Sequence, residues 1–181
     1  MNKRRLMMIL VVIIGVPLFI WIQFFEVPNK VRIGEEKMQQ DPETHVFEKV
    51  LSFEHAYMGD ASNINELFSA LPLNEYKGTL EMDPDTFSLV VNYTSAVEEM
   101  EKQAKQAVIY NTTAGFTLIE NLETIDMKFE DKSYIVTRDY VEKWFGTTLI
   151  DFKEPEVFKQ KVQDHLTEDI DSWLVAYTEG E

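Results

Sequence analysis

An uncharged apolar stretch near the N-terminus constrains this chain more than any other feature. Residues 6–25 contain no charged side chain, and a helix of that length spans roughly 30 Å, the thickness of the hydrocarbon core of a bilayer. Basic residues occupy positions 3–5, and only Glu26 directly follows the stretch. Because basic residues favour the cytoplasmic side, we expect a cytoplasmic tail at 1–5, a single transmembrane helix at 6–25 and an extracytoplasmic remainder.

Two other interpretations of this stretch stay open. A cleaved signal peptide has a shorter apolar core and a small-residue cleavage site, whereas residues 23–28 read Gln-Phe-Phe-Glu-Val-Pro. A buried helix of a soluble protein is disfavoured by the length of the uncharged run. The chain has no cysteine. This excludes a lipid anchor on cysteine, disulfides, thiolate metal sites and a cysteine nucleophile.

The charge of the chain is distributed very unevenly. Of 17 basic residues, three precede the apolar stretch, whereas all 32 acidic residues follow it, which leaves residues 26–181 with a net charge of −18. So acidic a surface argues against nucleic acid as a partner, because phosphates attract basic faces. It is also repelled by anionic lipid head groups. A solvated surface explains the charge, and attraction to cations or to a basic partner is the functional alternative.

The remainder of the chain predicts an α+β fold: one domain with an antiparallel sheet and packed helices. Because residues 26–40 are polar, we expect a stalk there. We expect the extracytoplasmic domain at residues 41–153, and a C-terminal helix and tail at residues 154–181. Apolar spacing and turn signals predict helices at 41–53, 63–71, 96–122, 139–145 and from Pro155, and strands at 79–82, 87–93, 124–130 and 133–137. Asn111 to Gly115 weaken the middle of the long helix, so a bend or break is expected there as an alternative to a continuous helix.

A segment around Tyr57 combines a turn with a helix start. Gly59 suits a turn, and Asp60, Ser62 or Asn63 can cap the helix that follows, Asn63 with the spacing of a capping box. We group Tyr57, Gly59, Asp60, Ser62, Asn63 and Glu66 as a candidate structural motif. A second capping box is predicted at Ser95 and Glu98.

The segment Tyr57–Leu73, which reads YMGDASNINELFSALPL, resembles a bacterial family known as domain of unknown function 4825. The likeness continues through 80–93, 107–122 and 134–140, and covers roughly residues 45–150. The resemblance implies an extracytoplasmic module tethered to a bacterial cell membrane. Similar domains are attached to membrane metallopeptidases of the antibiotic-sensor type. The resemblance assigns no catalytic residue, because none is known for the family.

The sequence offers no complete catalytic constellation. Its histidines are His45, His55 and His165. No two of them are spaced i, i+4, so a zincin-type zinc site has no support, and the acidic residues around His165 predict a solvated helix face. Asp60 and Ser62 lie near His55 in sequence, but helix capping explains both. We therefore expect no catalytic residue, no bound metal and no cofactor. Paired carboxylates leave a hydrolase as an alternative.

Aromatic side chains give a further indication of function. Tyr140, Trp144 and Phe145 lie on one short predicted helix, and Trp173 and Tyr177 lie near the C-terminus. Core packing explains them, and an exposed contact patch for another protein is the alternative. We expect a single-pass membrane protein with a binding or sensory role rather than an enzyme. Its expected partners are the membrane, through residues 6–25, and a protein or small ligand of the envelope. A divalent-cation-binding protein is a further alternative.

Overall fold

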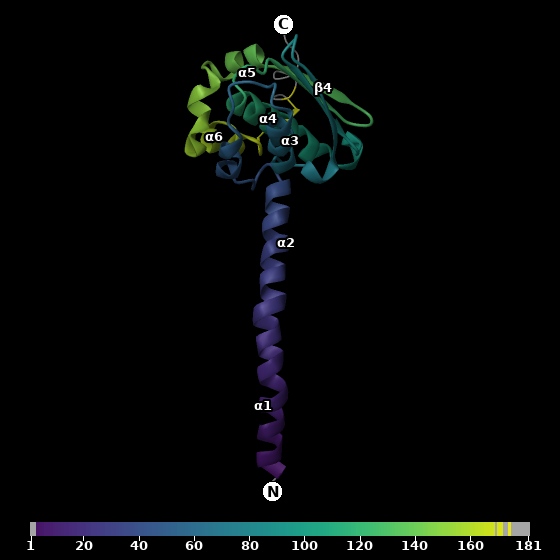
Figure 1. Ribbon diagram of the computed structural model, residues 1–181, viewed down its shortest axis with the longest axis vertical. Helices are drawn as coiled ribbons and strands as arrows, with labels where there is room; N and C mark the ends of the chain where they lie inside the picture. The colour runs from purple at the N-terminus through teal and green to yellow at the C-terminus, as the bar shows by residue number, and fades with distance from the viewer. Residues whose placement is uncertain (1–2, 169, 172–173, 175–181) are drawn as a thin grey trace. The chain divides into compact units, whose positions relative to one another are not determined.

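The computed structural model describes residues 3–168, 170–171 and 174 (Figure 1). The chain divides into two units, with the boundary between Met38 and Gln39.

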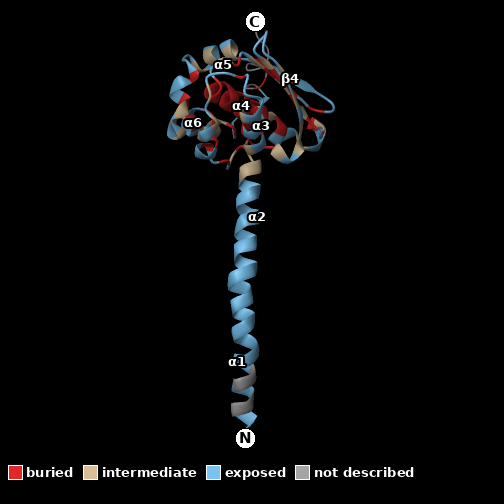
Figure 2. Cartoon of the chain, in the orientation of Figure 1, coloured by how far each residue is buried: buried red, intermediate tan, exposed pale blue. Residues whose placement is uncertain are grey.

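The first unit is helical throughout its described residues. It contains α1 (Lys3–Trp21), a π-helical turn (Ile22–Glu26) and most of α2 (Val27–Gln40). Pro17 lies inside α1 without ending it. Among the described residues, this helix is the one that is long and apolar enough to cross a membrane. Its described side chains are exposed along the apolar part (Figure 2). The predicted stalk at 26–40 is thus itself helical.

The second unit is an α+β domain, which confirms the predicted fold class. Its strands are β1 (Lys77–Asp83), β2 (Ser88–Tyr93), β3 (Thr124–Lys128) and β4 (Ser133–Thr137). Its α-helices are α3 (Ala61–Ala70), α4 (Glu101–Leu118), α5 (Arg138–Phe145) and α6 (Pro155–Lys161). Short 3-10 helices complete it: η2 (Phe47–Phe53), η3 (Asn74–Tyr76), η4 (Val97–Glu99), η5 (Leu149–Lys153) and η6 (Gln163–His165).

The four strands form one sheet in the order β1-β2-β3-β4. The outer pairs β1·β2 and β3·β4 are antiparallel, as predicted, but the central pair β2·β3 is parallel. The sheet is therefore mixed, and the expectation of a purely antiparallel sheet is wrong. The reason is the connection between β2 and β3, which contains α4 and returns the chain to the same end of the sheet, as a parallel pair requires.

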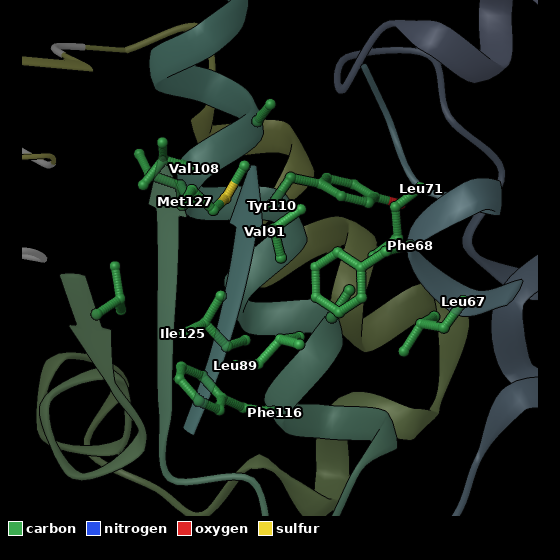
Figure 3. Close-up of a cluster of buried hydrophobic side chains, with 14 of the residues drawn as sticks. Leu67, Phe68, Leu71, Leu89, Val91, Val108, Tyr110, Phe116, Ile125 and Met127 are labelled. Atoms are coloured by element: carbon green, nitrogen blue, oxygen red, sulfur yellow. The ribbon is translucent and has the colours of Figure 1, made fainter. Parts of the chain in front are cut away.

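Helix α4 is the centre of the domain and is buried from Gln106 to Leu118 (Figure 2). Figure 3 shows apolar side chains of α3 on one side of it and those of β2 and β3 on the other. A Cβ placed on Gly115 would lie 2.8 Å from Ile125 Cδ1 and 3.3 Å from Phe68 Cζ. Glycine thus permits the close approach of helix, strand and α3 at this point.

The break that was considered at Asn111–Gly115 does not occur, because the polar side chains there are bonded within the core. Asn111 Nδ2 donates to Pro72 O at 2.9 Å, and Thr112 Oγ1 donates to Val108 O at 2.7 Å. Tertiary contacts thus override the weak helix propensity of the segment.

The helix caps differ from the two predicted capping boxes. Asp60 is the N-cap of α3 and accepts a hydrogen bond from Asn63 N at 3.1 Å. Asn63 is therefore not the cap; its side-chain nitrogen donates to Phe53 O at 2.8 Å.

The predicted box at Ser95 and Glu98 is also wrong, since α4 begins after Met100. Instead, the carboxylate of Asp131 accepts from Val97 N at 2.6 Å and from Glu98 N at 3.2 Å. These backbone hydrogen bonds hold the pKa of Asp131 below its ordinary value.

The described part of the C-terminal segment contributes to the core through Phe158, Val162 and Leu166, which are buried. Pro155 opens α6 as predicted, but the helix ends at Lys161 and continues as η6. Phe158 is buried and stacks on Phe47 at 3.8 Å between ring centroids. The expected helix at 41–53 is shorter than predicted: a turn at Asp41 precedes η2.

Candidate binding site at the end of helix α4

The Tyr57 segment lies against the C-terminal end of α4. His55 N donates to Leu118 O at 2.8 Å, and Glu120 N donates to His55 O at 3.1 Å. Met58 N donates to Asn121 Oδ1 at 2.6 Å, and the Met58 side chain is buried. These bonds bring together segments more than sixty residues apart in sequence.

The residues of the candidate motif have different structural roles. Asp60 caps α3, and Asn63 ties the helix to η2. Tyr57 is held with its side chain 68% exposed. Gly59, Ser62 and Glu66 are exposed. Asp60 and Asn63 thus have architectural roles, whereas the aromatic ring of Tyr57 is presented to solvent.

Arg138 caps the end of α4 from another element, the first residue of α5. Its Nε donates to Leu122 O at 2.9 Å, and its Nη2 donates to Phe116 O at 2.8 Å and to Ile119 O at 2.7 Å. A cation suits the unpaired carbonyls at a helix C-terminus. Burial lowers the pKa of the guanidinium, which nevertheless stays charged in proteins.

The third guanidinium nitrogen of Arg138, Nη1, does not share the backbone hydrogen bonds that Nε and Nη2 make. Within the described residues, the one carboxylate oxygen that lies within 4.0 Å of Nη1 is Glu142 Oε1, at 4.0 Å. That distance is too long for a hydrogen bond. Nη1 therefore retains donor capacity at the edge of the helix end.

A pocket of about 210 Å³ opens beside Arg138. Its polar lining comes from Thr117, Glu120, Arg138, Glu142, Thr148 and Lys153, and its apolar lining from Phe116, Leu149 and Ile150. Lys153 Nζ donates to Glu54 Oε1 at 2.8 Å and to Glu120 Oε1 at 3.0 Å. The hydrogen bond that Lys153 donates to Glu54 is the largest cause of the raised pKa of Lys153. This ion pair links the segment before Tyr57 to the pocket wall.

The pocket offers donors, acceptors and an apolar wall within a small volume. Arg138 and Lys153 supply cationic donors, Glu120 and Glu142 supply acceptors, and Ile150 is 63% exposed. The Thr117 hydroxyl, on the buried side, has no hydrogen-bond partner among the described residues. Such a lining suits a small polar molecule with an apolar part.

Sequence reasoning did not identify this pocket. Its charged residues come from the segment that follows α4, from α5 and from η5, and Glu120 and Lys153 are 33 positions apart in the chain. The one available signal was the Thr-Arg pair at Thr137 and Arg138, within the hairpin segment on which the family resemblance was based.

The three histidines occupy separate places. His45 is buried, with Nδ1 at 2.7 Å from Tyr110 Oη and Nε2 at 3.0 Å from Ala70 O. His55 Nδ1 lies 2.8 Å from Tyr57 O and 3.1 Å from Tyr57 N, and His165 pairs with Glu168 at 3.1 Å. The described residues contain no group of three or more His, Asp or Glu side chains arranged to hold a metal ion.

Of the aromatic residues considered as either core residues or an exposed contact patch, some are packed in the core and one is partly exposed. Tyr140 and Phe145 pack against the core, and Phe145 meets Phe152 at 4.9 Å between ring centroids. Trp144 is 38% exposed. Trp173 and Tyr177 lie outside the described residues.

A comparison with protein families identifies the family to which the chain belongs. A family model described as a domain of unknown function, DUF4825, matches residues 50–140. Neither the curated proteins nor the solved structures gave a match. The matched range contains all four strands, α3, α4 and the Arg138 cap. The resemblance inferred from the sequence motifs is thus confirmed, and the chain belongs to the DUF4825 family.

Proposed function

We propose that this chain is a membrane-anchored sensory module whose α+β domain lies outside the cytoplasm and binds a small polar ligand at the end of α4. Support for the anchor comes from the apolar helix and from the basic residues at 3–5. The basic residues before the apolar stretch support a cytoplasmic N-terminus through the positive-inside rule. The bilayer helix keeps the domain near the membrane and raises its effective concentration for other membrane-bound molecules.

The observation that carries the binding proposal is the pocket beside Arg138. Its volume of about 210 Å³ equals that of roughly seven liquid waters, so the ligand is a small molecule rather than a folded partner. Donors from Arg138 and Lys153 and acceptors from Glu120 and Glu142 line this space, and Lys153 Nζ donates to Glu120 Oε1 at 3.0 Å. A molecule that carries both an acceptor and a donor group, next to an apolar part, matches the lining best.

Native mass spectrometry tests this proposal. The full chain is extracted from its own membranes in mild detergent, and a noncovalent small-molecule adduct is measured. Ile150→Trp fills the pocket from its exposed wall. Ile135→Trp, a matched change of another exposed isoleucine outside the pocket, is the control. We expect an adduct on the wild type and on the control that is lost from Ile150→Trp. Absence of an adduct, or its retention by Ile150→Trp, contradicts the proposal.

A further inference from the structure

The two edges of the sheet differ in how they are protected. β1 carries Lys77, Glu81 and Asp83, and its register with β2 shifts between Lys77 and Leu80. Charges and irregular pairing keep edge strands from joining other chains. β4 reads Ser-Tyr-Ile-Val-Thr, without charge or proline, and pairs with β3 in a continuous register. β4 therefore lacks the usual devices that block strand pairing.

The hairpin register determines which backbone groups of β4 face outward. Phe129 N donates to Lys132 O at the turn, and Arg138 N donates to Glu123 O at the other end. Because bonded and non-bonded residue pairs alternate along an antiparallel ladder, the residues of β4 that exchange hydrogen bonds with β3 are the second and fourth.

Those two residues are Tyr134 and Val136, whose side chains are buried. Ser133 and Ile135 direct their N–H and C=O groups away from β3, and within the described residues these groups have no partner on that side. The Ile135 side chain is 57% exposed. A rigidly held strand thus presents free backbone donors and acceptors beside an exposed apolar side chain.

We propose that the β4 edge is a docking site for an extended segment of a protein partner, which adds to the sheet as a further strand. The segment is apolar in its centre and basic at its flanks, because residues 26–181 carry a net charge of −18 and opposite charge steers association. The same charge disfavours a second copy of this chain as the occupant. This proposal does not depend on the pocket beside Arg138.

Peptide binding to the full chain in detergent micelles tests the site. The probe is a fluorescent peptide, Lys-Lys-Val-Thr-Val-Thr-Val-Lys-Lys, and its counterpart has Glu in place of every Lys. Ile135→Pro removes one outward N–H, which an edge strand tolerates because that N–H is absent from the ladder. Ile135→Lys, a second variant, keeps the N–H but places a charge on the edge. Val90→Lys changes the same face of the sheet on the central strand β2 and is the matched control.

We expect the basic peptide to bind, and its affinity to fall about tenfold with Ile135→Pro, as the loss of one backbone hydrogen bond implies. We expect a similar fall with Ile135→Lys, a fall of less than about twofold with Val90→Lys, and weaker binding of the acidic peptide. Hydrogen exchange at Ser133 and Ile135 should slow when the peptide is present. Absence of binding, equal binding of both peptides, or indifference to both Ile135 variants overturns the proposal. So does a chain that sediments as a dimer with Ser133 and Ile135 already protected, which would make a second copy the occupant.

Discussion

His45 makes the stability of the α+β domain depend on pH in a defined window. The carbonyl of Ala70 only accepts, so His45 Nε2 carries the proton and donates to it at 3.0 Å. Nδ1 is therefore unprotonated and accepts from the Tyr110 hydroxyl at 2.7 Å. Burial favours this neutral form and lowers the pKa of His45 from 6.5 to about 4.

The sign and size of the effect follow from proton linkage. The unfolded chain takes up a proton near pH 6.5, whereas the folded chain resists it until about pH 4. The contribution of His45 is thus fully present above the unfolded pKa and is lost as the pH falls through this window. With 1.36 kcal/mol for each unit of pKa, the loss between about pH 7 and about pH 4.5 is roughly 2 kcal/mol.

Urea unfolding of the full chain in detergent micelles, followed by circular dichroism over this pH range, measures the effect. His45→Gln keeps a donor and an acceptor but does not titrate. We expect the free energy of unfolding of the wild type to approach that of His45→Gln by roughly 2 kcal/mol as the pH falls. Tyr110→Phe is the matched control: it removes a hydrogen bond but leaves His45 buried, so it lowers stability while the pH slope persists. Parallel curves for the wild type and His45→Gln would refute the reasoning.

Three further predictions concern the packing and capping around α4, each measured as a change in the free energy of unfolding of the full chain. Asp60→Ala should cost about 1 kcal/mol, because Asp60 caps α3; no loss would show that the cap is elsewhere. Gly115→Ala should destabilise by about 1 kcal/mol, since crowding against Ile125 outweighs the gain in helix propensity. Ile125→Val should recover part of that loss in the double variant, and strict additivity would contradict the contact. Thr117→Val should be neutral or stabilising by about 1 kcal/mol, because the buried hydroxyl is unpaired, whereas Thr112→Val should destabilise.

The sequence correctly predicted those turns and helix ends that are determined by residues close to them in the chain. The β3–β4 hairpin forms as predicted, although Lys132 pairs with Phe129, so the two turn residues are Glu130 and Asp131, one position before the predicted pair. Gly146 ends α5 with a φ of +67°, a conformation that glycine adopts without steric cost. Pro155 opens α6 at its first position. In each case the residues that determine the conformation lie within one or two turns of chain.

The structure differs from the sequence prediction where a helix cap or a strand pairing depends on residues that are distant in the chain. Asp131 binds the backbone before α4 from a hairpin more than thirty residues away, so Ser95 is not needed as a cap. The parallel pairing of β2 and β3 follows from the path of α4 over the sheet, which periodicity alone does not specify. Arg138 gained its role only when folding placed it on the carbonyls of Phe116 and Ile119.

The pocket beside Arg138 was missed for the same reason. Its ionic side chains are ordinary surface types in sequence, and the Lys153–Glu54 contact joins residues 99 positions apart. The candidate motif, in contrast, was found from sequence because its cap and turn are local, but those local roles are structural.

Every functional proposal depends on the side of the membrane on which the α+β domain lies. Because the chain has no cysteine, single cysteines introduced at exposed positions report location with a membrane-impermeant maleimide. Glu66→Cys lies on α3, and Lys3→Cys lies at the first residue of α1, before the apolar stretch. We predict that, in intact cells, Glu66→Cys is labelled and Lys3→Cys is labelled only after permeabilisation, with both variants in the membrane fraction. The opposite labelling, or recovery of the chain outside the membrane fraction, would contradict the account.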